Sequence, residues 1–327
     1  MATASGDILR LVRKGIDVKA VHAHTRKPFR FYLAGDPALI AEMRGFLLSG
    51  HDETVPADAA ACLETINLNV PQPTLAQEAR LVLFMGRKGD FAGADLNLLR
   101  SLRLPIMAIT VDERGVTAGP PAAPAAGSAA EYVVPSLTRE ALRGRVLPHI
   151  VECSKGVEIA VGRRLPPLRE AVAAKLTRDA ANNALKVALA SAVVDHIPLV
   201  GLVMGLFASA GDMVAITGIQ MMLMLHIEAT YGRDPDVQRM WQLLPVIGGG
   251  FGWRSLAREL SGFIPVAGIA IKGAIAYAGT IVVGEGVTFY YQQGRHMSAG
   301  DARALYESAK NEAMTFARDL LKRITNR

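Results

Sequence analysis

The sequence predicts an α/β domain with a parallel sheet, followed by an all-α hydrophobic helical domain. Over the first 150 residues, short apolar runs of strand length alternate with helical patterns, an order typical of parallel α/β sheets. After about residue 165 the apolar residues come in much longer runs. The chain has 327 residues, half of them hydrophobic, so it is long enough for two domains.

Four apolar runs of strand length, each with turn residues nearby, define the predicted strands. They are Phe29–Ala34, Leu81–Met85, Pro105–Val111 and Tyr132–Val134. Helices are predicted to follow the strands at 37–48, 94–102 and 138–150. Asp36 is the expected N-cap of the first helix and Thr138 that of the last. The segment 117–130 is rich in Pro, Gly and Ala and is predicted to be a loop or linker.

Charge and composition indicate the kind of partner. The net charge is +6, the basic residues are scattered, and aromatic residues make up only 6% of the chain. A stacking platform for nucleic acid is therefore not predicted, whereas an anionic membrane surface suits this balance. The two cysteines, Cys62 and Cys153, lie far apart in the sequence. They indicate a reducing compartment and neither a disulfide framework nor a metal cluster.

The first residues show no secretory signal pattern. Residues 5–14 instead combine apolar and basic residues at helical spacing. Two interpretations remain open: a short helix packed on its own domain, or a helix lying on a membrane surface.

The turn after the first strand has the position of a phosphate-binding loop but lacks its residues. Such a loop requires G-x-x-x-x-G-K-[ST]. Here Gly35 is followed by Ile40, Ala41 and Glu42 where Gly, Lys and Ser/Thr are needed. Asp36 places a carboxylate at the helix N-terminus, where a phosphate would otherwise bind. The order of elements resembles an Era-like GTPase domain, and the resemblance implies a degenerate, GTPase-like domain over residues 1–150.

Two further GTPase motifs are missing from this half. Asp-x-x-Gly, which would bind magnesium, does not follow Leu81–Met85, and Thr110–Arg114 lacks the Asn-Lys-x-Asp that reads guanine. Nucleotide hydrolysis is therefore not expected, and no catalytic or cofactor-binding residue is predicted. The alternative is a generic doubly wound domain in which Gly35 and Gly86 are turn residues.

A helical stalk is predicted over residues 151–196, built on a helix from Leu168 to Val194. Charged residues along this helix are expected to form a solvated face; they are Arg169, Glu170, Lys175, Arg178 and Asp179.

The apolar runs Ile197–Leu225 and Phe263–Val283 are the candidates for membrane contact. A spanning helix needs about 20 apolar residues. The first run is predicted to break at Ser209–Gly211 into two pieces too short to span, and Pro265 interrupts the start of the second. Because the flanking basic residues give no positive-inside bias, we expect broken or hairpin helices dipping into the bilayer from the cytoplasmic face. The alternative is a very apolar helical bundle.

Small residues in the second run fall at helical spacing, at Gly268, Gly273, Ala276 and Gly279. They predict a smooth face on which another helix can lie close. Upstream, a glycine hinge at 248–250 is predicted to precede a short charged helix, Arg254–Leu260.

Several ungapped strings in this half match, in order, the YcjF-like, GTPase-associated family of unknown function. They are Ile197-Pro198, Gly211-Asp212, Ile219-Gln220 to Tyr231-Gly232, the Gly-Gly-Gly before Arg254, Leu256–Leu260, Ile264-Pro265, Lys272-Gly273 to Tyr277–Thr280, and Tyr290-Tyr291. The resemblance covers about residues 165–310. It implies a helical, often membrane-associated module over residues 197–296, and no particular reaction.

Candidate functional residues are few. His22 and His24 lack a nearby third ligand, H-E-x-x-H and G-x-S-x-G do not occur, and no metal site is predicted. The candidate buried polar positions are Asp212, Lys272 and Glu285, charges within apolar surroundings that each need a partner or water. Two interpretations remain open: an internal ion pair or membrane-interface position, and a polar track through the helical module.

An amphipathic helix is predicted at the C-terminus, over residues 297–327, with Ser298 or Asp301 as its cap. Its apolar stripe follows helical spacing and comprises Ala302, Leu305, Ala309, Ala313, Phe316, Leu320 and Ile324. It is expected to pack on the rest of the protein, with a partner-binding helix as the alternative.

These patterns predict a non-enzymatic, membrane-associated scaffold or adaptor on the cytoplasmic side of the membrane. It needs no cofactor, and it self-associates through its small-residue helix faces. The protein partner is not indicated. Two alternatives remain: a weak nucleotide-responsive switch, and a soluble, cytoplasmic helical interaction protein.

Overall fold

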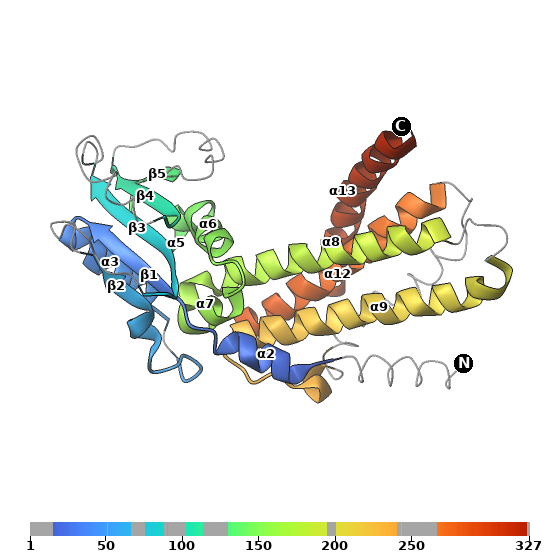
Figure 1. The fold of residues 1–327 in the computed structure, drawn as a ribbon, viewed down its shortest axis with the longest axis horizontal. Helices are drawn as coiled ribbons and strands as arrows, with labels where there is room; N and C mark the ends of the chain where they lie inside the picture. Colours follow the sequence, from blue (N-terminus) through green and yellow to red (C-terminus); the bar gives the residue numbers. More distant parts are fainter. Residues whose placement is uncertain are drawn as a thin grey trace. The chain divides into compact units, whose positions relative to one another are not determined.

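The computed structural model (Figure 1) describes residues 16–50, 52–66, 76–87, 90, 103–113, 130–194, 201–240, 243 and 267–325. Within helices, the side chains of 190–194, 201–213, 267–272 and 316–325 are outside this description. The chain divides into two compact units. Ala23–Val172 and Thr230–Arg233 form an α/β unit, and the rest of the described chain forms a helical unit.

The α/β unit contains a sheet of five strands: β1 (Arg30–Gly35), β2 (Leu63–Thr65), β3 (Ala79–Arg87), β4 (Ile106–Val111) and β5 (Ala130–Val134). Their order is β2-β1-β3-β4-β5, and every neighbouring pair is parallel. This is one of the common orders of doubly wound sheets. The predicted parallel sheet is confirmed, as are the four predicted strands. The sequence did not predict β2, which has only three residues.

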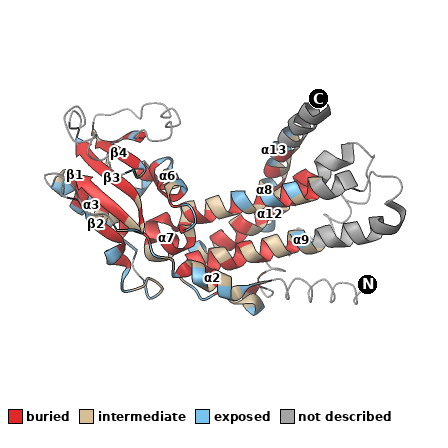
Figure 2. Ribbon diagram, in the orientation of Figure 1, coloured by how far each residue is buried: buried red, intermediate tan, exposed pale blue. Residues whose placement is uncertain are grey.

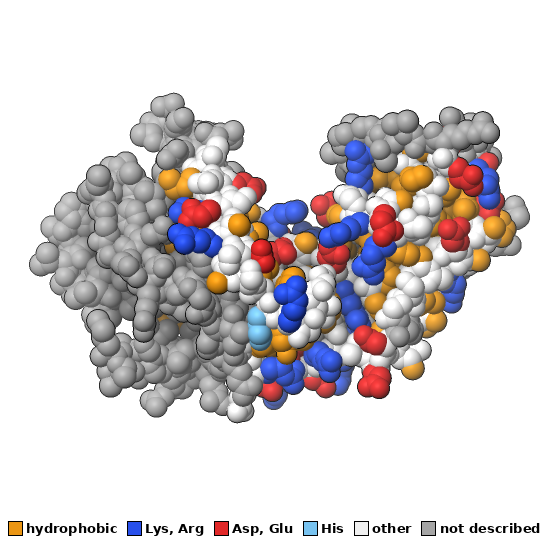
Figure 3. Space-filling view, turned by 180° about the vertical axis from the view of Figure 1, so that it is seen from behind, with side chains coloured by type: hydrophobic (Ala, Val, Ile, Leu, Met, Phe, Trp, Pro, Cys, Tyr) orange, Lys and Arg blue, Asp and Glu red, His pale blue; other side chains and the backbone are white. Residues whose placement is uncertain are grey.

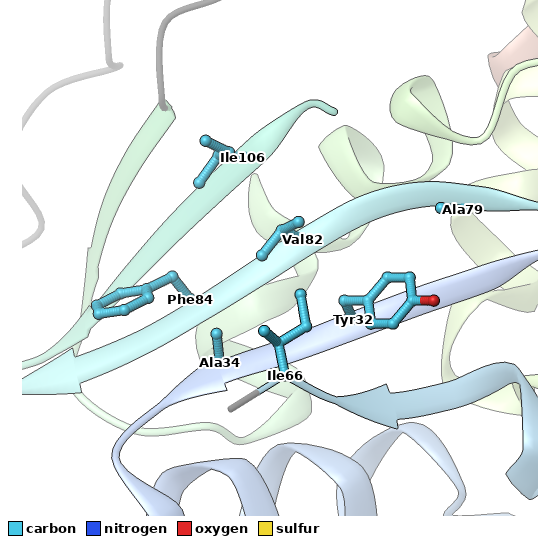
Figure 4. Packing of buried hydrophobic residues seen from close by; sticks show 7 residues of the cluster. All are labelled: Tyr32, Ala34, Ile66, Ala79, Val82, Phe84 and Ile106. Atoms are coloured by element: carbon cyan, nitrogen blue, oxygen red, sulfur yellow. The ribbon is translucent and has the colours of Figure 1, made fainter. Parts of the chain in front are cut away.

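The central strands are buried on both faces, as parallel strands usually are. Both β1 and β3 are buried along most of their length (Figure 2). β3 is buried at every position from Leu81 to Gly86, and Phe31 and Leu33 of β1 are fully buried. Alternate residues form a cluster on one face of the sheet (Figure 4). Its members are Tyr32, Ala34, Ile66, Ala79, Val82, Phe84 and Ile106. This cluster joins β1, β3 and β4 on that face of the sheet.

Short helices complete the α/β unit. They are the last residues of α2 (Val18–Thr25), then α3 (Pro37–Leu47), α5 (Arg139–Arg143), α6 (Val146–Cys153) and α7 (Glu158–Arg164), with 3₁₀ turns η1 (Ala59–Cys62) and η3 (Pro166–Leu168). α3 packs against β1 and β3, and α6 against β3. The predicted helix after the first strand is confirmed as α3.

The single helix predicted from Thr138 towards Ile150 is wrong, because α5 and α6 are separate helices. Arg145 between them has non-helical angles, with φ −141° and ψ −48°. Pro148 explains the break. In a continuous helix it would lose a backbone hydrogen bond and its ring would clash with the carbonyl of Gly144. In α6 it lies in the first turn, where its missing N–H costs nothing.

The helical unit is built from four long helices: α8 (Arg169–Val194, whose first four residues belong to the α/β unit), α9 (Gly201–Thr230), α12 (Ala267–Gln293) and α13 (Ala299–Thr325). The predicted stalk helix is confirmed as α8. The predicted break at Ser209–Gly211 is wrong, because α9 is continuous. Ser and Gly cost at most about 1 kcal/mol each in a helix interior, and α9 contains no proline.

The predicted C-terminal helix is confirmed as α13, which begins with the expected cap. The Ser298 hydroxyl accepts from the Asp301 N–H at 3.1 Å and donates to the Asp301 carboxylate at 2.6 Å. Its described part packs on α12 through a cluster of Ala278, Val282, Ala302, Tyr306 and Ala309. Tyr306 lies outside the predicted stripe.

Some predicted elements lie outside the described residues. They are the helices over 5–14, 94–102 and 254–260, the glycine hinge at 248–250 and the loop at 117–130 apart from Ala130. Within the described chain, no helix has a stretch both apolar and long enough to cross a bilayer.

Candidate functional site

The first candidate site is the carboxyl edge of the sheet between β1 and β3. In doubly wound sheets, ligands bind outside the strand ends where the chain reverses its direction across the sheet. Here Gly35 has φ +106°, and a Cβ on it would lie 1.9 Å from the Met85 carbonyl oxygen. The next N–H, of Asp36, donates to that oxygen at 2.9 Å. Glycine is therefore required for the close approach of the two strands at this edge.

Asp36 occupies the helix N-terminus that a phosphate-binding loop would use. Its carboxylate accepts from the N–H groups of Ala38 at 2.8 Å and Leu39 at 3.1 Å. These backbone donors and the positive end of the helix dipole are the features that attract phosphate to a helix N-terminus. In this chain the side chain of Asp36 already binds them, and its negative charge repels a phosphate.

The neighbouring strand ends add more acidic groups. The Arg87 N–H donates to the Asp90 carboxylate at 2.6 Å, and the Asp112 N–H donates to the Val134 carbonyl at 3.0 Å. Three carboxylates, those of Asp36, Asp90 and Asp112, thus follow β1, β3 and β4. An acidic edge of this kind opposes binding of a polyphosphate unless cations accompany it.

Removal of the Asp36 carboxylate should weaken α3. We expect Asp36→Ala to lower the free energy of unfolding by about 1 kcal/mol, because two N–H groups lose their acceptor. Asp36→Asn keeps a side-chain oxygen and should lose less. Urea unfolding of the two variants and the wild type measures both effects, and equal stabilities of all three proteins would contradict this role of Asp36.

The second candidate site is the seam where α8, α9 and α12 meet within the helical unit (Figure 1). Ala184 and Ala188 of α8 pack against Ala276 of α12, beside Ile216 and Ile219 of α9. A Cβ on Gly273 would lie 2.6 Å from the Leu185 side chain. The predicted small-residue face is therefore confirmed at Gly273 and Ala276. The surroundings of Gly268 are not described.

Buried hydroxyl and amide groups occur on the same three helices. They belong to Thr177, Thr217, Gln220, Thr280 and Thr288. The Thr280 hydroxyl donates to the Ala276 carbonyl at 2.8 Å and accepts from Gln220 Nε2 at 3.3 Å. Thr288 donates to the Gly284 carbonyl at 2.8 Å. Small residues together with interhelical polar contacts are typical of helices that pack closely in membranes.

The three predicted polar positions are only partly described. Asp212 lies in α9 and Lys272 in α12, but their side chains are outside the description. The proposed ion pair between them remains a prediction. Glu285 lies on α12 and is partly exposed. The described side chains therefore give a polar seam of neutral groups, which the sequence reasoning missed because it searched only for charges.

A fully buried carboxylate was also missed. Glu228 has no exposed surface. It accepts from the Asp236 N–H at 3.0 Å, from the Tyr291 hydroxyl at 3.1 Å and from the guanidinium of Arg239. These contacts join the end of α9 to residues 236–239 and to the end of α12. The apolar run predicted from the sequence ends at Leu225, three residues before Glu228. Glu228 was therefore not among the predicted buried charges.

Burial raises the pKa of the Glu228 carboxyl, although its hydrogen bonds and Arg239 oppose the shift. The folded-state pKa of Glu228 is raised above its ordinary value of 4.5. The contribution of Glu228 to the free energy of unfolding is therefore largest below pH 4.5, and it is lost as the pH rises through the folded-state pKa. We therefore expect Glu228→Gln to gain in stability relative to the wild type as the pH rises from 4 to 7. Urea unfolding at several pH values measures this difference, and a relative gain by the wild type would contradict it.

One charged residue of the predicted solvated face is buried. The Arg169 guanidinium donates to Thr54 Oγ1 at 2.8 Å, to the Asp52 carboxylate at 3.3 Å and to the Gly162 carbonyl at 3.3 Å. It also lies 5.9 Å from the centre of the Tyr231 ring. The solvated-face prediction is therefore wrong for Arg169. The sequence periodicity of α8 could not show that its first turn enters the core of the α/β unit.

Histidine and cysteine side chains form no described metal cluster. No group of three or more His, Cys, Asp or Glu residues suited to a metal occurs among the described residues. The Tyr132 hydroxyl hydrogen-bonds to Nδ1 of His149. Burial raises the pKa of the Cys62 and Cys153 thiols to about 11. Both thiols therefore stay protonated at neutral pH, when a thiol is a poor nucleophile.

The net charge is not gathered into one patch on the face drawn in Figure 3. There, the described Lys and Arg side chains lie among Asp and Glu side chains.

Comparison with family models, with curated proteins and with solved structures gave no match.

Proposed function

We propose that this chain is a non-enzymatic scaffold or adaptor at the cytoplasmic side of a membrane, with a degenerate GTPase-like domain and a YcjF-like helical module. The seam of α8, α9 and α12 carries the proposal. Its contacts combine Gly, Ala and Thr residues with Ile and Leu side chains, and they include a buried Gln220–Thr280 hydrogen bond. Helices that associate in lipid need such close contacts, because apolar side chains gain little there by leaving the solvent.

The state of the β1–α3 turn supports the non-enzymatic part of the proposal. Asp36 uses the N–H groups that would hold a phosphate. Ala41 stands where the phosphate-binding lysine would be. The domain then serves to bind or display a protein partner, and the helical module holds it at the membrane or joins it to a second copy.

Flotation with lipid vesicles tests the membrane part. The purified full chain is mixed with vesicles of phosphatidylcholine, with or without phosphatidylserine, and centrifuged through a density gradient. We expect the protein to float with the vesicles and to stay with them in high salt, because apolar contact is not screened. Floating only at low salt with the anionic vesicles would indicate surface attraction without insertion. Protein that stays at the bottom in both cases would support a soluble helical interaction protein.

A weak nucleotide-responsive switch is the second candidate. The observation that favours it is the sheet order, which places a helix N-terminus at the carboxyl end of β1. Titration of the wild type with fluorescently labelled GTP tests it, with Asp36→Ala as a matched variant. Saturable micromolar binding by the wild type would favour the switch. The scaffold proposal predicts no saturation, because the Asp36 carboxylate blocks the helix N-terminus.

A further inference from the structure

We propose that the helical unit contains an internal binding site for a single water molecule, held by Gln220 of α9 and Thr177 of α8 against α12. Gln220 is 5% exposed and Thr177 is 1% exposed. Gln220 Oε1 and Thr177 Oγ1 are buried and have no hydrogen-bond partner among the described residues. The site is independent of the proposed membrane role, because it depends only on the interior of this unit.

The Gln220 amide points into the seam. Its Nε2 donates to Thr280 Oγ1 at 3.3 Å, which leaves Oε1 in need of a donor. Rotating the amide by 180° does not remove the need. The Thr280 hydroxyl has one proton, and it already donates to the Ala276 carbonyl at 2.8 Å. In either orientation at least one polar atom of the amide lacks a partner, and such a buried atom costs about 1–3 kcal/mol.

Thr177 approaches the same face of α12 about one turn further along. A Cβ on Gly284 would lie 2.2 Å from Thr177 Oγ1, so this hydroxyl lies directly against the helix at Gly284. Thr280 and Gly284 are four residues apart, a rise of about 6 Å along a helix. Gln220 and Thr177 therefore contact adjacent turns of α12.

These two groups select the chemistry of the ligand. Gln220 Oε1 requires a donor, whereas the Thr177 hydroxyl can donate or accept. Water meets both needs, and buried waters in proteins typically bind groups that otherwise lack partners. A larger ligand is disfavoured by the close packing at Gly284. A small neutral donor such as ammonia or methanol would share this chemistry, but water is by far the most abundant.

A nuclear magnetic resonance experiment on the full chain tests the site directly. With glutamine labelled by ¹⁵N, the side-chain amide protons of Gln220 should show a cross-peak to water with the sign of a long-lived bound molecule. Loss of the signal in Gln220→Leu assigns it. Thr288→Val is the matched control, because it removes a buried hydroxyl that already has the Gly284 carbonyl as its acceptor. This control should keep the water cross-peak.

The stability of Gln220→Leu gives a second and independent result. If water completes the hydrogen bonds of Gln220, leucine removes satisfied groups, and the urea midpoint should be unchanged or lower. Thr280 is not orphaned by the change, because it keeps its bond to Ala276. If Gln220 has no water partner, leucine removes an unsatisfied group and the midpoint should rise. A raised midpoint, or no cross-peak to water in the wild type, would overturn the proposal.

Discussion

Replacing Gly35 with alanine is expected to unfold most of the α/β unit, at a cost of about 4 kcal/mol or more. The added Cβ would lie 1.9 Å from the Met85 carbonyl oxygen and 2.9 Å from the Met85 carbonyl carbon. These are backbone atoms of β3, paired with β1 along its length, so they cannot move aside cheaply. The φ of +106° at Gly35 adds strain for any residue with a side chain. Hydrogen exchange of peptides from β1 and β3 would measure the loss.

Gly45→Ala is the matched control for this experiment. Gly45 lies in α3, ten residues further on, and a Cβ there would meet nothing within 4 Å. Alanine in an exposed helix should therefore stabilise the unit by about 0.5–1 kcal/mol. If the amides of β1 and β3 exchanged as slowly in Gly35→Ala as in Gly45→Ala, the close contact between Gly35 and Met85 would be contradicted.

The second large effect is expected at Gly284, where alanine should destabilise the helical unit by about 3 kcal/mol. A Cβ there would lie 2.2 Å from Oγ1, 2.5 Å from Cγ2 and 2.8 Å from Cβ of Thr177. Thr177 is branched at Cβ and buried, so rotation of its side chain places one of its groups in the same space. Hydrogen exchange in α8 and α12 would report the separation of the two helices.

Gly279→Ala provides the comparison on the same helix. Its nearest neighbour would be Gln220 Nε2 at 3.8 Å, an ordinary contact. The change should therefore be neutral or stabilising by up to about 1 kcal/mol. Equal effects of the two substitutions would show that α8 does not approach α12 at Gly284.

The main features of the α/β unit could be predicted because its signals are local. The first strand ends at Gly35 and the next helix begins with Asp36-Pro37. Three adjacent residues therefore determine the strand end, the helix cap and the first helical turn. β2 could not be predicted, because Leu63–Thr65 gains its strand pairing from β1 and has no pattern of its own. Predicting the break before α6 would have required giving Pro148 more weight than the helical periodicity around it.

In the helical unit, the sequence predicted the small-residue face but not the polar groups around it. Gly273 and Ala276 stand out by spacing alone. Thr177 and Gln220 do not, because a Thr or Gln on a helix is usually solvated, and only the packing of three helices shows that both are buried. The continuity of α9 was also not predicted from the sequence. Ser209 and Gly211 favour a break locally, but the long helix contains no proline to force one.

The central claim, association with a membrane, is tested most directly by fractionation of cells that make the full chain, lysed without detergent. Our account predicts that the protein sediments with the membranes, remains there after a high-salt wash, and is released by detergent. Recovery of the protein wholly in the soluble fraction would contradict it.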